Sequence, residues 1–140
     1  MKKTLIFILF IFFVFTMFGC ENTTSSTINN TDNNGLDYSD FSELMILDPN
    51  LQLNMPESDY YLYFYGEQCT WCNTIKIDVL TTIALAKDTK IYLVRVKYFS
   101  DISEDIDLGG TPAMFHIVNG EVQEEFEGAY DILDLLKELT

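Results

Sequence analysis

The chain has 140 residues, enough for one domain of ordinary size, and its 48% hydrophobic and 21% charged residues are typical of a globular protein. Its 8 basic and 22 acidic residues give a formal net charge of −14, which disfavours a nucleic-acid-binding protein because such a protein needs a basic face. Three cysteines and one histidine are too few for a disulfide framework or a multi-zinc module, and no glycine-rich phosphate loop is present.

Residues 1–20 have the layout of a secretory signal: a basic start, an apolar run from Leu5 to Phe18, and Gly19–Cys20 at the end. As a helix, these 14 residues, all apolar except Thr16, would reach about 21 Å, less than the thickness of a bilayer core. The Gly-Cys ending resembles a bacterial lipoprotein signal. That resemblance implies that Cys20 is lipidated and anchors the chain outside the cytoplasm. An uncleaved signal anchor and a plain secreted product are the alternatives.

Residues 21–36 are expected to form a flexible polar tether. Eleven of residues 21–35 are Asn, Thr or Ser, so this segment cannot bury enough apolar surface to offset the cost of ordering it. The folded domain is therefore expected to span residues 37–140.

The domain is expected to begin with a helix over residues 40–47, where apolar residues follow helical spacing, Asp40 starts a capping box and Pro49 follows the last turn. Residues 50–58 show no clear period and receive no assignment. The aromatic run Tyr60–Tyr65 predicts a strand that is covered on both faces.

A second helix is expected to begin near Cys69–Thr70, because apolar residues then recur on one helical face: Cys72, Ile75, Val79, Ile83 and Ala86. Residues 91–97, rich in β-branched side chains, predict a second strand. Strand, helix and strand at this spacing predict a βαβ unit with a parallel pair of strands.

Residues 98–110 are expected to form a loop with one helical turn. Strands over residues 113–118 and 121–126 flank Asn119–Gly120, a sequence typical of a tight hairpin turn. An amphipathic helix over residues 129–139 is expected to close the chain, with an inner face of Ile132, Leu135, Leu136 and Leu139.

The chemistry is expected at Cys69–Thr70–Trp71–Cys72, which follows a buried strand and opens a helix. Free N–H groups and the helix dipole stabilise a thiolate at Cys69, and a partner three residues on is close enough for a disulfide. The pair therefore predicts a dithiol redox centre, in which Cys69 attacks a substrate disulfide and Cys72 resolves the mixed disulfide. A structural disulfide and a metal site are the alternatives. We expect no metal, because the one histidine, His116, lies too far along the chain to complete a site.

The spacing of these features resembles the thioredoxin family. Pro112 follows Cys72 by 40 residues, Asn119–Gly120 opens a hairpin, and Gly128 follows the hairpin. The resemblance implies an α/β thioredoxin fold, with a central mixed sheet of about four strands flanked by helices. It also implies that Thr111–Pro112 is a cis pair beside the disulfide and that the Thr111 backbone pairs with an extended substrate. Trp71 is expected either to pack or to form part of a substrate platform.

The chain departs from thioredoxins at three places: Gln68 precedes the first cysteine, Thr70–Trp71 separates the pair, and Tyr63 stands where thioredoxins keep a buried aspartate. Four acidic residues occupy the loop before Pro112, namely Asp101, Glu104, Asp105 and Asp107. We expect this loop to lie on the side of the active site. There it would either favour basic or neutral substrates or form a merely solvated acidic loop. His116 is expected to be a hydrogen-bonded strand residue.

These observations predict a monomeric, extracytoplasmic thiol–disulfide oxidoreductase, anchored to the cell membrane by lipidated Cys20. It would act on disulfide-containing proteins or peptides, with no nucleic-acid partner. It would need no cofactor beyond the Cys69–Cys72 disulfide, and a membrane thiol transporter is a candidate electron donor. The alternative is a thioredoxin-like accessory lipoprotein, for example in bacteriocin export, that docks a partner without redox turnover.

Overall fold

A four-stranded mixed β-sheet forms the centre of the computed structural model, which describes residues 35–140. The strands are β1 (Asp59–Tyr65), β2 (Ile91–Arg95), β3 (Ala113–Val118) and β4 (Glu121–Glu127), in the order β2-β1-β3-β4. Strands β1 and β2 run parallel, as predicted, and the other two pairs are antiparallel. The expected signal segment 1–20, lipidated Cys20 and nearly all of the tether lie outside the described residues.

Strand β1 lies in the middle of the sheet because its side chains are apolar on both faces. Tyr63 and Tyr65 belong to one buried cluster, whereas Leu62 and Phe64 belong to the cluster on the opposite face. Alternate residues of a strand point to opposite faces, so this continuous aromatic run supplies two cores at once. The prediction of a strand covered on both faces is confirmed.

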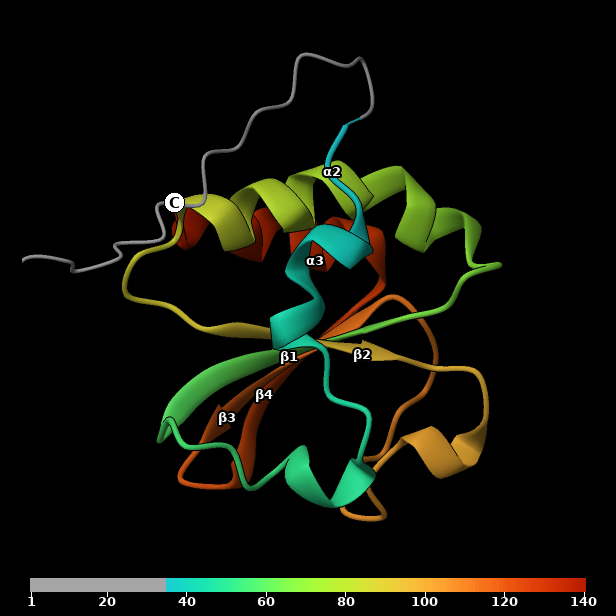
Figure 1. Ribbon diagram of the computed structural model, residues 1–140, viewed down its shortest axis with the longest axis vertical. Coiled ribbons are helices and arrows are strands. Elements are labelled where there is room, and N and C mark those ends of the chain that lie inside the picture. The colour runs from blue at the N-terminus through green and yellow to red at the C-terminus, as the bar shows by residue number, and fades with distance from the viewer. Residues whose placement is uncertain (1–34) are drawn as a thin grey trace, which may run out of the picture. The chain divides into compact units, whose positions relative to one another are not determined.

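Two helices cover one face of the sheet, α2 (Thr70–Leu85) and α3 (Gly128–Glu138), and they pack against each other (Figure 1). Helix α2 begins where it was predicted to begin. Its inner face buries Cys72, Ile75, Val79, Leu80 and Thr82, whereas Ile83 and Ala86 are only partly buried. Helix α3 buries Ala129, Ile132, Leu135 and Leu136. No helix within residues 35–140 is long and apolar enough to cross a membrane.

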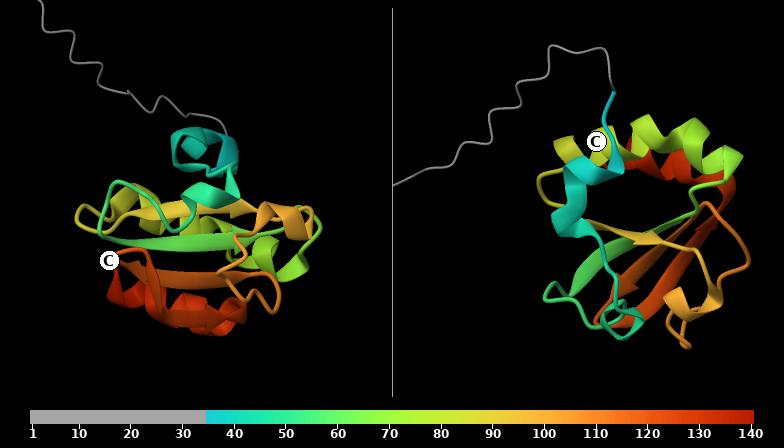
Figure 2. Two further views of the ribbon diagram at one scale, coloured as in Figure 1. Left: turned by 90° about the horizontal axis from the view of Figure 1, so that it is seen from below. Right: turned by 45° about the vertical axis from the view of Figure 1, so that its right-hand side comes forward.

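The other face of the sheet is covered by irregular segments and short 3-10 turns (Figure 2). These include η2 (Pro49–Leu51) and η3 (Phe99–Asp101), and the second of these is the single helical turn expected in the loop after β2. Buried Gln52 joins the two segments, since its Nε2 donates to the carbonyl of Asp101 (2.6 Å) and its Oε1 accepts from the N–H of Ser103 (2.8 Å).

The helix predicted over residues 40–47 is wrong in both position and type. The segment forms a 3-10 helix, η1 (Tyr38–Leu44), which Asp37 caps in place of Asp40. Met45 then bridges to Leu93 of edge strand β2, and the N–H of Ile46 donates to the Leu93 carbonyl (2.9 Å). The chain is extended at Met45 and Ile46 because these residues pair with the open edge of the sheet.

Two smaller features of the sheet follow from single residues. Strand β2 ends two residues earlier than predicted because the Asp101 carboxylate accepts from the N–H groups of Lys97 and Tyr98, both at 2.7 Å, and turns the chain. In the β3–β4 turn, Asn119 and Gly120 both have positive φ, as predicted for this hairpin. Position 120 also needs glycine because a Cβ there would lie 2.8 Å from the Leu53 carbonyl oxygen.

Candidate active site

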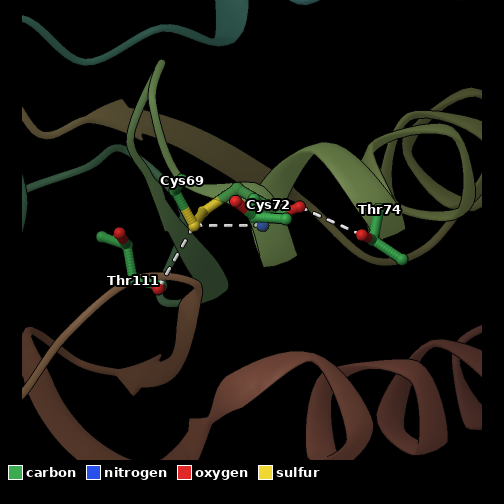
Figure 3. The surroundings of a disulfide bond; sticks show 5 residues. Cys69, Cys72, Thr74 and Thr111 are labelled. Carbon is green, nitrogen blue, oxygen red and sulfur yellow. Dashed lines mark hydrogen bonds between the residues drawn. A yellow bond between two sulfur atoms is a disulfide. The ribbon is translucent and has the colours of Figure 1, made fainter.

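Cys69 and Cys72 are joined by a disulfide at the start of α2, with their Cα atoms 5.2 Å apart (Figure 3). Cys69 is the N-cap residue of the helix and is partly exposed, whereas Cys72 is completely buried. A break after β1 at Gly66 lets the chain turn into the helix, so the pair sits at the carboxyl end of the parallel strands. An attacking thiol must be accessible to the substrate, as Cys69 is. A resolving thiol needs only to reach its partner, as Cys72 does.

One backbone N–H group close to Cys69 Sγ would stabilise a negative charge on that sulfur. The backbone N–H of Cys72 donates to this sulfur at 3.0 Å, as the first turn of a helix allows. Both groups are drawn in Figure 3, together with the carbonyl oxygen of Thr111, which lies 3.3 Å from the same sulfur. A thiolate formed at Cys69 on reduction would keep the N–H donor.

Thr111 and Pro112 lie beside the disulfide although more than 40 positions of sequence separate Thr111 from Cys69. Their peptide bond is cis, as the resemblance implied, and Pro112 is buried at the start of β3. Strand β3 pairs with β1, so the start of β3 lies next to the end of β1 and hence next to α2. The fold thereby brings together the four residues Cys69, Cys72, Thr111 and Pro112.

A hollow of about 550 Å³, which we call the aromatic hollow, lies beside this group. Trp71 and Tyr130 form its walls with their ring centroids 6.0 Å apart, and 54% and 74% of the two residues is exposed. This exposure favours the platform interpretation of Trp71. The remaining lining residues are Gly109, Gly110, Thr111, Pro112, Glu127, Gly128 and Ala129. Sequence reasoning missed Glu127 and Tyr130, although both stand close to Gly128, which the family pattern did single out.

A second hollow, of about 500 Å³, is lined by Cys69 and Thr111 and, unlike the aromatic hollow, by basic residues. It contains Arg95 and Lys97, two of the chain's 8 basic residues. Arg95 is paired with Glu67 (2.8 Å between Nη1 and Oε1), and the Lys97 Nζ lies over the ring of Tyr98, 5.3 Å from its centroid. Cys69 therefore shares this hollow with two basic residues, one of which is paired with the Glu67 carboxylate.

Tyrosines, not carboxyl groups, fill the core next to Cys72. Tyr63 belongs to the same buried cluster as Cys72. Neither its hydroxyl nor that of Tyr38 makes a hydrogen bond of normal geometry within residues 35–140, although the two phenols are close enough to influence each other's pKa. Burial raises the pKa of Tyr63 and raises the pKa of Tyr65 to about 12. Both phenols are therefore protonated at neutral pH, and Tyr63 does not replace the buried aspartate of thioredoxins as a proton acceptor.

We expect Tyr63→Phe to keep the rate of thiol–disulfide exchange within about twofold and to change the free energy of unfolding by less than about 1 kcal/mol, because the hydroxyl makes no hydrogen bond of normal geometry within residues 35–140. Turnover and urea unfolding measure the two effects. The matched control is Tyr60→Phe, which removes a buried hydroxyl that donates to the Gln52 carbonyl at 2.8 Å and should cost about 1–3 kcal/mol. A tenfold loss of rate in Tyr63→Phe would contradict this view.

Two acids of the loop before Pro112, Asp101 and Asp105, do not contact the disulfide. Asp101 caps the turn after β2, and Asp105 lines a hollow with Asn119 and Gly120, at the hairpin end of β3, away from Thr111. His116 Nε2 lies 2.9 Å from Oδ1 of Asp59, and its ring stacks on Tyr61, which confirms a hydrogen-bonded strand histidine.

No model of a known protein family matches the chain. No curated protein matches it either. Solved structures do match. The oxidised thioredoxin from Plasmodium falciparum has a TM-score of 0.57 at 16% identity, over 67% of this chain and 94% of its own. Mitochondrial thioredoxin 3 from Saccharomyces cerevisiae (oxidised form) has a TM-score of 0.56 at 17% identity, over 68% of this chain and 91% of its own. Thioredoxin NaTrxh from Nicotiana alata has a TM-score of 0.57 at 18% identity, over 67% of this chain and 86% of its own. The chain therefore has the thioredoxin fold.

Proposed function

We propose that this chain is an extracytoplasmic thiol–disulfide oxidoreductase that acts on protein or peptide disulfides. The observation that carries the proposal is the disulfide itself: an accessible N-cap cysteine bonded to a completely buried one, beside the Thr111 carbonyl. The thioredoxin fold supports it, because several of the solved structures that match the chain are thioredoxins.

In the reducing direction the Cys69 thiolate attacks one sulfur of a substrate disulfide, and the other substrate sulfur leaves as a thiolate that takes up a proton. The Cys72 thiol then loses its proton and attacks Cys69 Sγ in the mixed disulfide. The second substrate thiol leaves, and the Cys69–Cys72 disulfide forms. Two electrons have passed from the chain to the substrate. Oxidation of a substrate dithiol is the same sequence reversed.

Continued turnover needs a partner that resets the cysteine pair. A reductase would draw electrons from a donor across the membrane, such as an integral thiol transporter, and an oxidase would need a quinone-linked or small-molecule oxidant. The pair itself needs no further cofactor in either direction, because both electrons are held in the S–S bond.

The proposed location rests on residues 1–20, which resemble a lipoprotein signal ending in Cys20. An acidic chain gains nothing from an anionic membrane surface, so attachment would depend on the lipid. We expect Cys20→Ser to move the chain from the membrane fraction to the soluble or unprocessed fraction, as measured by fractionation and mass spectrometry of the mature N-terminus. Unchanged membrane association with no lipid mass on the wild type would contradict the lipoprotein assignment.

The direct test of the activity is whether the reduced chain reduces the interchain disulfides of insulin, followed as turbidity with dithiothreitol as the electron source. The comparison variant carries serine at both Cys69 and Cys72. If wild type and variant both fail to accelerate the reaction over dithiothreitol alone, the enzyme assignment falls. The accessory docking function, which does not need the cysteines, would then be the better account.

A further inference from the structure

The aromatic hollow contains one carboxylate, that of Glu127, at the end of edge strand β4. It lies directly against Gly109, so close that a side chain at position 109 would have to push its Oε1 aside. At Gly110, by contrast, a Cβ would meet nothing within 4 Å. Gly109 therefore makes room for the Glu127 carboxylate, and Gly110 leaves the space next to it open.

Glu127 has no cationic partner in the described part of the chain. Four ion pairs form within residues 35–140, and none of them includes this carboxylate. The carboxyl group beside it is another acid: partial burial raises the pKa of Glu125, and the negative charge of Glu127 raises it further. The hollow therefore carries an uncompensated negative charge.

The aromatic residues that line the hollow, like its negative charge, suit a cationic ligand. Trp71 and Tyr130 form a tilted aromatic pair with ring centroids 6.0 Å apart, and both residues are largely exposed. Aromatic faces attract cations, and the methylene stem of a lysine or arginine covers apolar surface while its charged end reaches a carboxylate. An acidic side chain would meet repulsion from Glu127, and an aliphatic one would bury ring surface without pairing the carboxylate.

We propose that the aromatic hollow binds a lysine or arginine side chain of the substrate, next to the substrate's reacting cysteine, with Glu127 pairing its charge. The proposal rests on the proposed function and names its substrate class: disulfides flanked by a basic residue. The position follows from Thr111, which lines the hollow and whose carbonyl oxygen lies 3.3 Å from Cys69 Sγ. An extended chain advances about 3.3 Å per residue, so a side chain in the hollow belongs to a residue near the cysteine.

The test uses the reduced full-length chain and three synthetic disulfide peptides that differ only in the residue beside the cysteine: arginine, leucine or glutamate. Each kcat/KM is divided by the rate constant for the same peptide with dithiothreitol, which removes intrinsic differences in disulfide reactivity. We expect the arginine peptide to exceed the glutamate peptide by about tenfold at low salt, with the ratio falling as salt is added.

Glu127→Gln should lower the arginine-to-glutamate ratio to about twofold. The control is Glu121→Gln, which removes the same charge at the far end of β4 and should leave the ratio unchanged, since Glu121 does not line the hollow. Equal corrected rates for the three peptides, a faster leucine peptide, or the same ratio in Glu127→Gln would each overturn this inference and leave the proposed function standing. Failure of the wild type to reduce any peptide would overturn both.

Discussion

Cys69→Ser is expected to lower the rate of disulfide exchange by about three orders of magnitude or more, because the variant has lost its accessible nucleophile. Cys72 cannot take over, since it is completely buried in the first turn of α2. Cys72→Ser should behave differently. Its Cys69 still attacks, but nothing resolves the product, so a mixed disulfide with the substrate should accumulate.

Non-reducing electrophoresis and intact mass measure this asymmetry, with insulin as substrate. The matched control is Ser42→Ala, an exposed hydroxyl far from the disulfide in sequence and outside both hollows, which should turn over like the wild type. Mixed disulfides that formed in Cys69→Ser and not in Cys72→Ser would reverse the assigned roles.

Phe64→Ala is expected to reduce the free energy of unfolding by about 3–5 kcal/mol. Phe64 is completely buried in central strand β1, where its ring meets Phe115 of β3 edge to face with centroids 5.4 Å apart. Its removal leaves a cavity between the sheet and the irregular segments that cover this face. Since small domains are stable by about 5–15 kcal/mol, such a loss is a large fraction of the total.

Urea unfolding followed by circular dichroism measures this loss. Phe99→Ala is the matched control, because it makes the same chemical change at a residue that is 90% exposed and should cost less than about 0.5 kcal/mol. If the two variants lost the same free energy of unfolding, the sheet face that the irregular segments cover would not be packed as described.

Local patterns predicted the elements whose conformation is signalled by their own residues. The run Tyr60–Tyr65 reads as a strand because apolar residues fill both faces, and Asn119–Gly120 reads as a turn because both positions need positive φ. The segment 40–47 was mispredicted because its conformation depends on a distant partner: Met45 and Ile46 pair with Leu93, and no local spacing signals that contact. Gln52 was likewise invisible, since its buried amide is satisfied by a loop about 50 residues away.

The candidate site divides in the same way. The Cys-x-x-Cys spacing and the distance to Pro112 were readable, and the structure places Cys69, Cys72, Thr111 and Pro112 together. The contribution of Tyr130 to the hollow could not be predicted, because Tyr130 looks like any exposed residue of an amphipathic helix until the fold pairs its ring with that of Trp71. The acidic loop shows the limit of local spacing: its four acids lie close together in sequence, but the chain carries Asp105 to the hairpin end of β3.

The central claim is that Cys69 and Cys72 form a reversible redox couple, and a redox equilibrium tests it most directly. The full-length chain is equilibrated in graded dithiothreitol or glutathione buffers while the fluorescence of Trp71, the one tryptophan and the residue before Cys72, reports the state of the disulfide. We predict a single two-electron transition between about −270 and −120 mV, the range covered by thiol–disulfide centres of this kind. A disulfide that stays unreduced throughout that range, or thiols that never oxidise within it, would contradict the claim.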